Sequence, residues 1–169
     1  MRGKLPLAGL SVVVVTTVAT TLGGAGPLPH PPSIEGTYRL VGRDLPDGSK
    51  QRPPNVVGLM TYTSQYRNFN VYVKDTSGKA FSVSYIATYR LTEKEYSEKS
   101  LYHLVNDEIG GTGMRYDLSG PTGASPVSIK DSRIAVKLPL YDEPTVVFEG
   151  DKLTATLTGH FVDHWEKVK

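Results

Sequence analysis

A single carboxylate stands out in this sequence because the alternation of its neighbours groups it with tyrosines. In the run 94–105, Tyr96, Glu98 and Tyr102 share one side if the run is a β-strand, whose side chains alternate between two faces. We take this tyrosine side as the inward one. A buried carboxylate needs an ion-pair or hydrogen-bond partner, because otherwise its pKa rises and it takes up a proton. Glu98 is therefore either paired with a tyrosine hydroxyl or an arginine, or it orients a ligand or acts in acid–base catalysis.

Tyrosines also occupy the inward positions of neighbouring runs. Tyr85 and Tyr89 lie with Phe81 on one face of the run 80–91, which alternates most regularly of all. Small-molecule pockets combine an apolar lining with a few placed polar groups, and tyrosine supplies both. The candidate ligand-binding residues are Tyr62, Phe81, Tyr85, Tyr89, Glu98 and Tyr102, and Glu98 is also the candidate catalytic residue. The alternative is ordinary core packing, in which the tyrosine hydroxyls bond to the backbone.

Other residue types form no recognisable catalytic or metal-binding pattern. His160 and His164 would share a helix face, but their segment alternates like a strand, in which four residues span about 13 Å. The chain has no cysteine, which excludes a disulfide, a thiolate zinc site and a catalytic thiol. Its glycine clusters lack a following Gly-Lys-Ser/Thr, and no Gly-x-Ser-x-Gly occurs. We expect neither a metal nor a cofactor.

The candidate side chains belong to short runs of alternating residue types that begin after Ile34. These runs are rich in Val, Thr, Tyr and Phe, and each is bounded by Gly, Pro, Asp or Asn. The runs are 37–43, 56–63, 69–74, 80–91, 94–105, 134–138, 145–149, 153–157 and 161–168. No amphipathic helix of three turns separates them, so sequential strands should pair antiparallel. The pattern predicts an all-β fold, either an antiparallel up-and-down barrel of about 8–10 strands or a sandwich.

The stretch 107–132 is the least regular part of this region. It is rich in Gly, Ser and Pro, and structureless connections of this length tend to be lids or binding loops. We expect a hairpin extension of the barrel that contains a short strand at 114–118.

Several short motifs, taken in order, resemble those of bacterial lipocalin-like domains, which belong to the calycin-type barrels. Gly36-Thr37-Tyr38 is similar to the opening Gly-x-Trp of that family, and Trp165-Glu166-Lys167-Val168 to its closing Trp-x-x-Val. The segments 58–63, 87–92, 96–98 and 149–153 are similar to its second strand, central hairpin and penultimate turn. The resemblance implies an antiparallel barrel with an interior cavity for a small, mostly apolar molecule.

Residues 1–33 have the three-part order of a secretory signal. Arg2 and Lys4 precede the apolar run 7–22, and a Gly- and Pro-rich segment follows. Because the run is shorter than the roughly 20 residues of a comfortable bilayer span, we favour a signal over an uncleaved anchor. The expected organisation is a signal or anchor with a linker over 1–33 and a barrel domain over 34–169. The protein would be secreted or periplasmic, attached to a membrane only through an uncleaved N-terminus.

The charge balance argues against nucleic acid as a partner. Two of the 19 Lys and Arg residues lie in the leader, so the remaining 17 balance the 17 Asp and Glu residues. A neutral body without a basic cluster lacks the electrostatic footprint on which nucleic-acid affinity depends.

Three functions stay open at this point. The first is a non-catalytic carrier or sensor that holds a small hydrophobic or aromatic molecule inside the barrel. The second is a barrel enzyme of cyclase or decarboxylase type, acting on an aromatic or polyene substrate through Glu98 with Tyr85, Tyr89 or Tyr102. The third is an interaction domain without a cavity.

N-terminal sequencing of the exported protein tests the leader assignment. We expect the mature chain to begin near 24–26, where small residues precede the proline cluster. A mature protein that starts at Met1 would contradict it.

Overall fold

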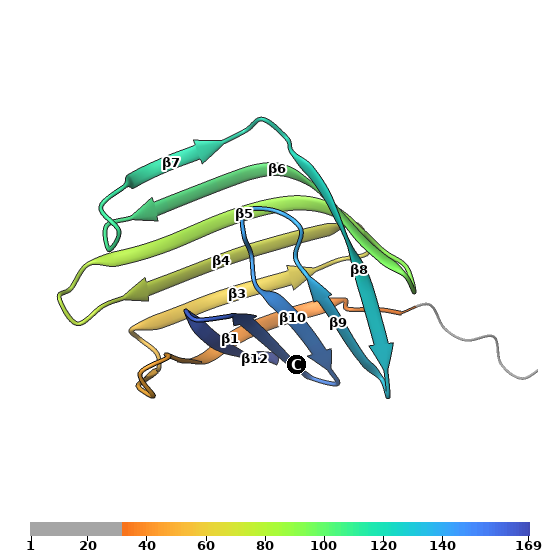
Figure 1. The fold of residues 1–169 in the computed structure, drawn as a ribbon, viewed down its shortest axis with the longest axis horizontal. Coiled ribbons are helices and arrows are strands. Elements are labelled where there is room, and N and C mark those ends of the chain that lie inside the picture. Colours follow the sequence, from red (N-terminus) through yellow and green to blue (C-terminus); the bar gives the residue numbers. More distant parts are fainter. Residues whose placement is uncertain (1–31) are drawn as a thin grey trace, which may run out of the picture. The chain divides into compact units, whose positions relative to one another are not determined.

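Twelve strands follow one another in the computed structural model, which describes residues 32–169 (Figure 1). They are β1 (Gly36–Asp44), β2 (Lys50–Gln51), β3 (Val56–Tyr62), β4 (Tyr66–Lys74), β5 (Ala80–Leu91), β6 (Glu95–Asp107), β7 (Gly113–Asp117), β8 (Thr122–Lys130), β9 (Arg133–Lys137), β10 (Thr145–Glu149), β11 (Lys152–Leu157) and β12 (Phe161–Lys167). No helix that could cross a membrane occurs in the part of the chain that the structure describes. The predicted signal or anchor lies outside the described residues.

Ten of these strands close into an antiparallel barrel. Their order around the ring is β12-β11-β10-β9-β8-β6-β5-β4-β3-β1, and β1 pairs with β12 to complete it. The two other strands lie beside the ring: β2 pairs with β1, and β7 pairs with β6. Because chain neighbours are ring neighbours, the barrel is of the up-and-down type, and the predicted all-β barrel of about 8–10 strands is confirmed. Figure 1 shows β3 to β6 side by side in one wall and the strands from β8 onward crossing in front of them in the other.

The alternation of residue types produces the core. In β3, for example, Val56, Gly58, Met60 and Tyr62 are buried, whereas the residues between them are more exposed. The same alternation on the other strands directs one face of each into the barrel. Rings from distant strands then meet edge to face, as Tyr62 and Phe148 do at a centroid distance of 5.5 Å.

Two β-bulges change which residues face inward. In β1 the register shifts between Leu40 and Gly42, so that Arg43 lies opposite Asp163 of β12. In β6 the pairing with β5 skips Leu101. An extra residue on one strand reverses the side to which all later side chains point.

The bulge in β6 makes part of one prediction wrong. Tyr96 and Glu98, which precede it, are buried in the barrel as expected. Tyr102 follows it and pairs with Ile86, whose side chain points outward and is 37% exposed. Tyr102 therefore lies on the outer face, and His103 takes the inward position that the alternation had assigned to its neighbour.

The stretch 107–132 is mostly strand rather than an irregular hairpin extension. The predicted short strand is present as β7, but β8 is an unpredicted strand of the barrel ring itself. The two divide β6 between them, because β8 pairs with Glu95–Lys99 and β7 with His103–Asp107. The composition of β8 is that of a loop, and its pairing with β6 and β9 overrides this local preference.

The close contact between Gly58 and Trp165 generates a test of the core. A Cβ at Gly58 would lie 2.8 Å from Trp165 Cη2 and 3.0 Å from the Asn70 carbonyl oxygen. We expect Gly58→Ala to lower the free energy of unfolding by about 1–3 kcal/mol, because overpacked cores are strained. Urea titrations followed by circular dichroism measure this loss. Trp165→Phe should lower the free energy of unfolding less in the Gly58→Ala variant than in the wild type. Strictly additive costs would show that the indole does not limit this position.

Candidate functional site

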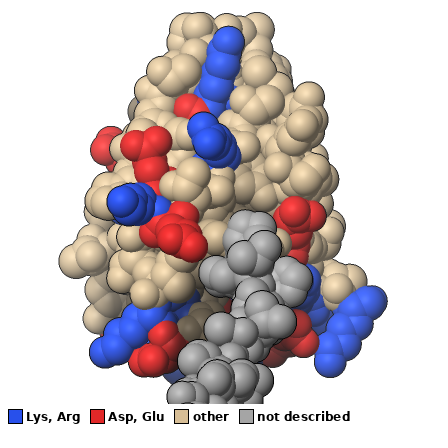
Figure 2. Space-filling view, turned by 90° about the vertical axis from the view of Figure 1, so that its right-hand side faces the viewer, with Lys and Arg blue, Asp and Glu red and all other residues tan. Residues whose placement is uncertain are grey.

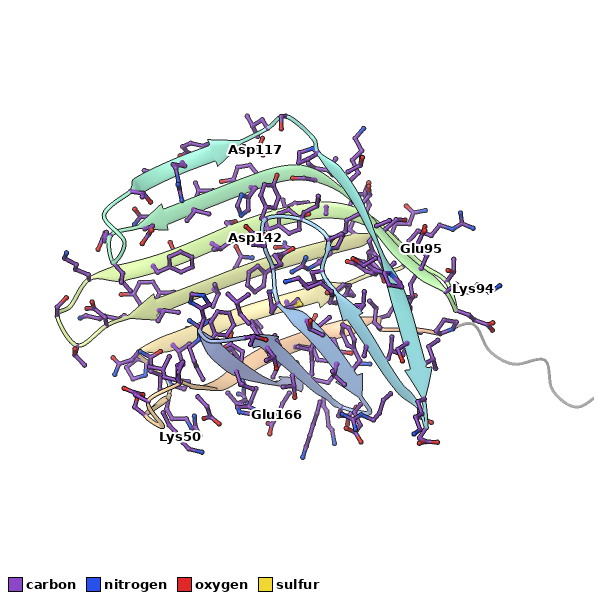
Figure 3. All side chains as sticks on the ribbon, in the orientation of Figure 1. Lys50, Lys94, Glu95, Asp117, Asp142 and Glu166 are labelled. Atoms are coloured by element: carbon purple, nitrogen blue, oxygen red, sulfur yellow. The ribbon has the colours of Figure 1, made fainter. Side chains whose placement is uncertain are left out.

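The barrel contains a partly open cavity of about 560 Å³. This volume falls in the range of small-molecule sites, roughly 300–1,000 Å³. Apolar side chains from both walls make up much of its lining: Met60, Phe69, Val71, Phe81, Val83, Val105, Leu138, Ala155, Leu157, Phe161 and Trp165. Figure 3 shows side chains of the two walls directed into the space between them. The cavity therefore suits a molecule with an apolar body.

A buried arginine lies at the base of this cavity and holds two carboxylates. Arg67, on β4, has a side chain that is only 1% exposed. Its Nη1 donates to Glu98 Oε1 at 3.0 Å and to Glu143 Oε2 at 2.9 Å, and its Nη2 donates to Glu143 Oε1 at 2.6 Å. The guanidinium also lies 5.1 Å from the ring centre of Tyr85 and 5.4 Å from that of Phe69. Arg67 and Glu143 line the cavity, so this cluster is its polar end.

Glu98 is buried, as its position in the alternation predicts, and it has both kinds of partner considered for it. Its side chain accepts hydrogen bonds from Arg67 and, at 2.8 Å, from the hydroxyl of Tyr96. Both reach Oε1, whereas Oε2 is buried and has no hydrogen-bond partner among the described residues. Burial raises the pKa of Glu98, and the neighbouring Glu143 adds to this effect although Arg67 opposes it. Glu98 does not line the cavity, and its side chain is fully buried against Arg67.

A second buried ion pair occupies the other wall. Arg43 donates from Nε to Asp163 Oδ1 at 2.6 Å and from Nη2 to Asp163 Oδ2 at 2.8 Å. The guanidinium stacks on Phe161, 3.9 Å from the ring centre. Burial raises the pKa of Asp163, and the bonds from Arg43 oppose this shift. The bulge in β1 makes the pair possible, because without it Arg43 would point outward.

The connection between β9 and β10, residues 138–144, crosses the barrel wall where β8 no longer pairs with β6. Tyr141 stacks on His103 at a centroid distance of 3.8 Å, and its hydroxyl lies 2.9 Å from Asp117 Oδ2 and 3.0 Å from Ser100 Oγ. Figure 3 labels Asp142 in this connection and Asp117 at the end of β7. Burial lowers the pKa of His103, which favours the neutral ring in this stack. These contacts of Tyr141 hold the connection in the position in which Glu143 binds Arg67.

The predicted ligand-binding residues separate into groups. Phe81 lines the cavity. Tyr62, Tyr85 and Glu98 form a buried layer around Arg67, and the hydroxyls of both tyrosines lack a hydrogen-bond partner among residues 32–169. Burial raises the pKa of both tyrosines.

The remaining two candidates lie away from this layer. The Tyr89 hydroxyl donates to the carbonyl oxygen of Thr63 at 2.6 Å, and its ring stacks on Tyr96. Burial raises the pKa of Tyr89 to about 12. Tyr102 contacts Tyr116 of β7 on the outer face, with ring centres 6.5 Å apart. Neither residue lines the cavity.

Three residues of the site escaped the sequence analysis. Arg67 lies two residues before Phe69 and shares its side of the strand. Extending the predicted run by two residues toward the N-terminus would have found it. Arg43 depends on a bulge, and Glu143 lies in a connection without periodicity. For these two, the sequence carries no local signal.

The described residues contain no group of three or more His, Cys, Asp or Glu side chains that could hold a metal ion. His164 belongs to a strand, as the alternation indicates, and its Nε2 lies 3.0 Å from Asp44 Oδ2. His160 lies in the turn that precedes this strand.

Surface charge offers no alternative site on the face that can be viewed directly. Figure 2 shows basic and acidic side chains interspersed on the end of the barrel that faces the viewer, without a continuous patch of one sign. Comparison with known proteins adds no assignment, because no family model, curated protein or solved structure matches the chain.

The pKa of Glu98 generates a pH-dependent prediction for stability. Because burial raises this pKa above its ordinary value of 4.5, the folded protein retains a proton that the unfolded chain loses as pH rises. The associated stability is present below 4.5 and is lost as pH rises through the folded pKa. We therefore expect Glu98→Gln, which stays neutral, to gain stability relative to wild type as pH rises above 4.5.

Urea unfolding followed by Trp165 fluorescence would measure this difference. Glu95→Gln, three residues earlier on the same strand and exposed, is the control and should follow the wild-type pH profile. Parallel profiles for Glu98→Gln and wild type would contradict a raised pKa in the folded state.

Proposed function

We propose that this protein is an exported lipocalin-like carrier or sensor that binds a small, mostly apolar molecule inside its barrel. The observation that carries the proposal is the cavity of about 560 Å³ with an apolar lining drawn from both walls. Small β-barrels either fill their interior with side chains or hold one small ligand, so an interior cavity favours ligand binding.

The electrostatics of the lining support an apolar body for the ligand. The two arginines of the cavity wall that are buried, Arg43 and Arg67, are each paired with a carboxylate of the protein. Such pairing leaves neither of these two guanidinium groups as an unpaired charge on the wall. Phe69, Phe81 and Phe161 add aromatic surface, which suits a hydrocarbon chain or an aromatic ring.

The extracellular or periplasmic location is part of the same proposal. It rests on the charge and hydropathy order of residues 1–33, and on the motifs that resemble lipocalin-like domains. The closed antiparallel barrel is compatible with that family, which commonly holds its ligands inside the barrel.

The barrel-enzyme alternative has no specific observation in its favour among residues 32–169. Glu98 does not line the cavity, and Tyr102 faces outward. An interaction domain without a cavity is disfavoured by the volume of the interior.

Trp165 provides a direct test, since it is the only tryptophan of the chain and lines the cavity. We expect the neutral apolar probe N-phenyl-1-naphthylamine to quench Trp165 fluorescence in a saturable manner. Val83→Phe adds volume inside the cavity and should weaken binding by about tenfold, equivalent to about 1.4 kcal/mol.

Val57→Phe is the matched control, because Val57 lies on the outer face and is 47% exposed. It should leave the affinity unchanged, with circular dichroism confirming that both variants fold. Absence of saturable quenching, or equal loss in both variants, would argue against an interior site.

A further inference from the structure

Arg67 binds the side chain of Glu143 in the way in which an arginine binds the carboxylate of a ligand. Both oxygens of Glu143 accept from the Nη atoms of Arg67, at 2.9 Å and 2.6 Å. This two-point arrangement is the usual way in which an arginine binds a free carboxylate. The two groups meet at the cavity surface, where apolar side chains such as Met60 and Phe69 adjoin them.

We propose that Glu143 occupies the place of a ligand carboxylate, and that the ligand is an apolar monocarboxylate whose head group displaces Glu143 from Arg67. This inference rests on the proposed function, since it assumes that the cavity binds an apolar molecule. It adds the chemical class of the head group and the residue that receives it.

The structure indicates which of the two carboxylates leaves. Glu98 belongs to a barrel strand, its side chain is fully buried, and Tyr96 also holds it. Glu143 belongs to a connection, and its side chain is 12% exposed. The two preceding residues, Tyr141 and Asp142, have φ values of 54° and 53°, in the left-handed region that non-glycine residues seldom adopt. The connection therefore holds a strained conformation whose release would accompany the departure of Glu143.

The charge of the cluster indicates an anionic head group. Arg67 donates to both Glu98 and Glu143, so removing Glu143 frees the two hydrogen bonds, at 2.9 Å and 2.6 Å, by which the guanidinium holds that carboxylate. A ligand carboxylate restores the charge and the hydrogen bonds that the site already accommodates. A hydroxyl head would accept fewer bonds from the guanidinium, and an ammonium head would oppose it.

Three amphiphiles of equal chain length and one substitution test the inference. Dodecanoate, dodecan-1-ol and dodecyltrimethylammonium are titrated against the wild type and Glu143→Gln, below their aggregation concentrations and at a pH that ionises the acid. Glutamine keeps the shape of Glu143 but binds the guanidinium less strongly and carries no charge. We expect the substitution to tighten dodecanoate binding about tenfold and dodecan-1-ol binding less than about twofold.

Glu149→Gln is the matched control, because Glu149 also pairs with an arginine, Arg133, but on the exposed side of the barrel. It removes the same charge and should leave all three affinities unchanged. Glu143→Ala serves as a second variant and should give the same selective gain for dodecanoate, should Glu143→Gln fail to fold.

The outcomes separate the two proposals. If dodecan-1-ol gains as much as dodecanoate, or if neither changes, the cavity binds apolar molecules but Arg67 does not receive the head group. Preferential binding of dodecyltrimethylammonium by the wild type would overturn the inference in favour of a cationic ligand. If no amphiphile and no neutral probe binds, the proposed function fails and the inference fails with it.

Discussion

The pairing of the first strand with the last is the constraint on which the interior depends. β1 and β12 join the ends of the sheet, so that the inner faces of all ten ring strands are enclosed. The same pairing sets Arg43 opposite Asp163 and brings Trp165 of β12 over the glycine at position 58 of β3. If the ring were open, these side chains would meet water instead of one another. Closure of the ring therefore produces the interior in which the charged pairs are buried and the cavity is enclosed.

The layer around Arg67 divides the barrel along its axis. On one side is a filled core, in which Phe148 packs edge to face on Tyr38 and on Tyr62 of the layer. On the other side lies the cavity, where the strands of the long wall extend past the pairing of β6 with β8. The guanidinium of Arg67 lies 6.0 Å from the ring centre of Tyr62, which packs on the filled core, and Arg67 also lines the cavity. It is thus the floor of the candidate site.

The buried ion pairs fix the positions of the segments that they join more than they stabilise the fold. Removing an ion from water costs several kcal/mol in effect, and the attraction within a pair offsets this cost only when the geometry is good. The apolar side chains of the core supply most of the favourable free energy of folding. What the pair of Arg67 and Glu143 adds is a tie between a barrel strand and a connection 76 residues away in the chain. The orientation of that connection, and with it one boundary of the cavity, depends on this tie.

The sequence by itself determined most of the strands, their antiparallel pairing in an all-β fold and the inward position of Glu98, because all of these follow from an alternation that each short run contains in full. Closure into a barrel rather than a sandwich was decided by the pairing of β1 with β12. The sequence also placed Phe81, Tyr62 and Tyr85 inside correctly. Only the tertiary structure decided the face of Tyr102 and of Arg43, since a bulge inserts one residue without altering the composition of the strand. It likewise decided that 122–130 is a strand and that Glu143 meets Arg67. The physical reason is that alternation is a local property, whereas bulges, the last ring strand and long-range ion pairs are selected by the free energy of closing the whole barrel.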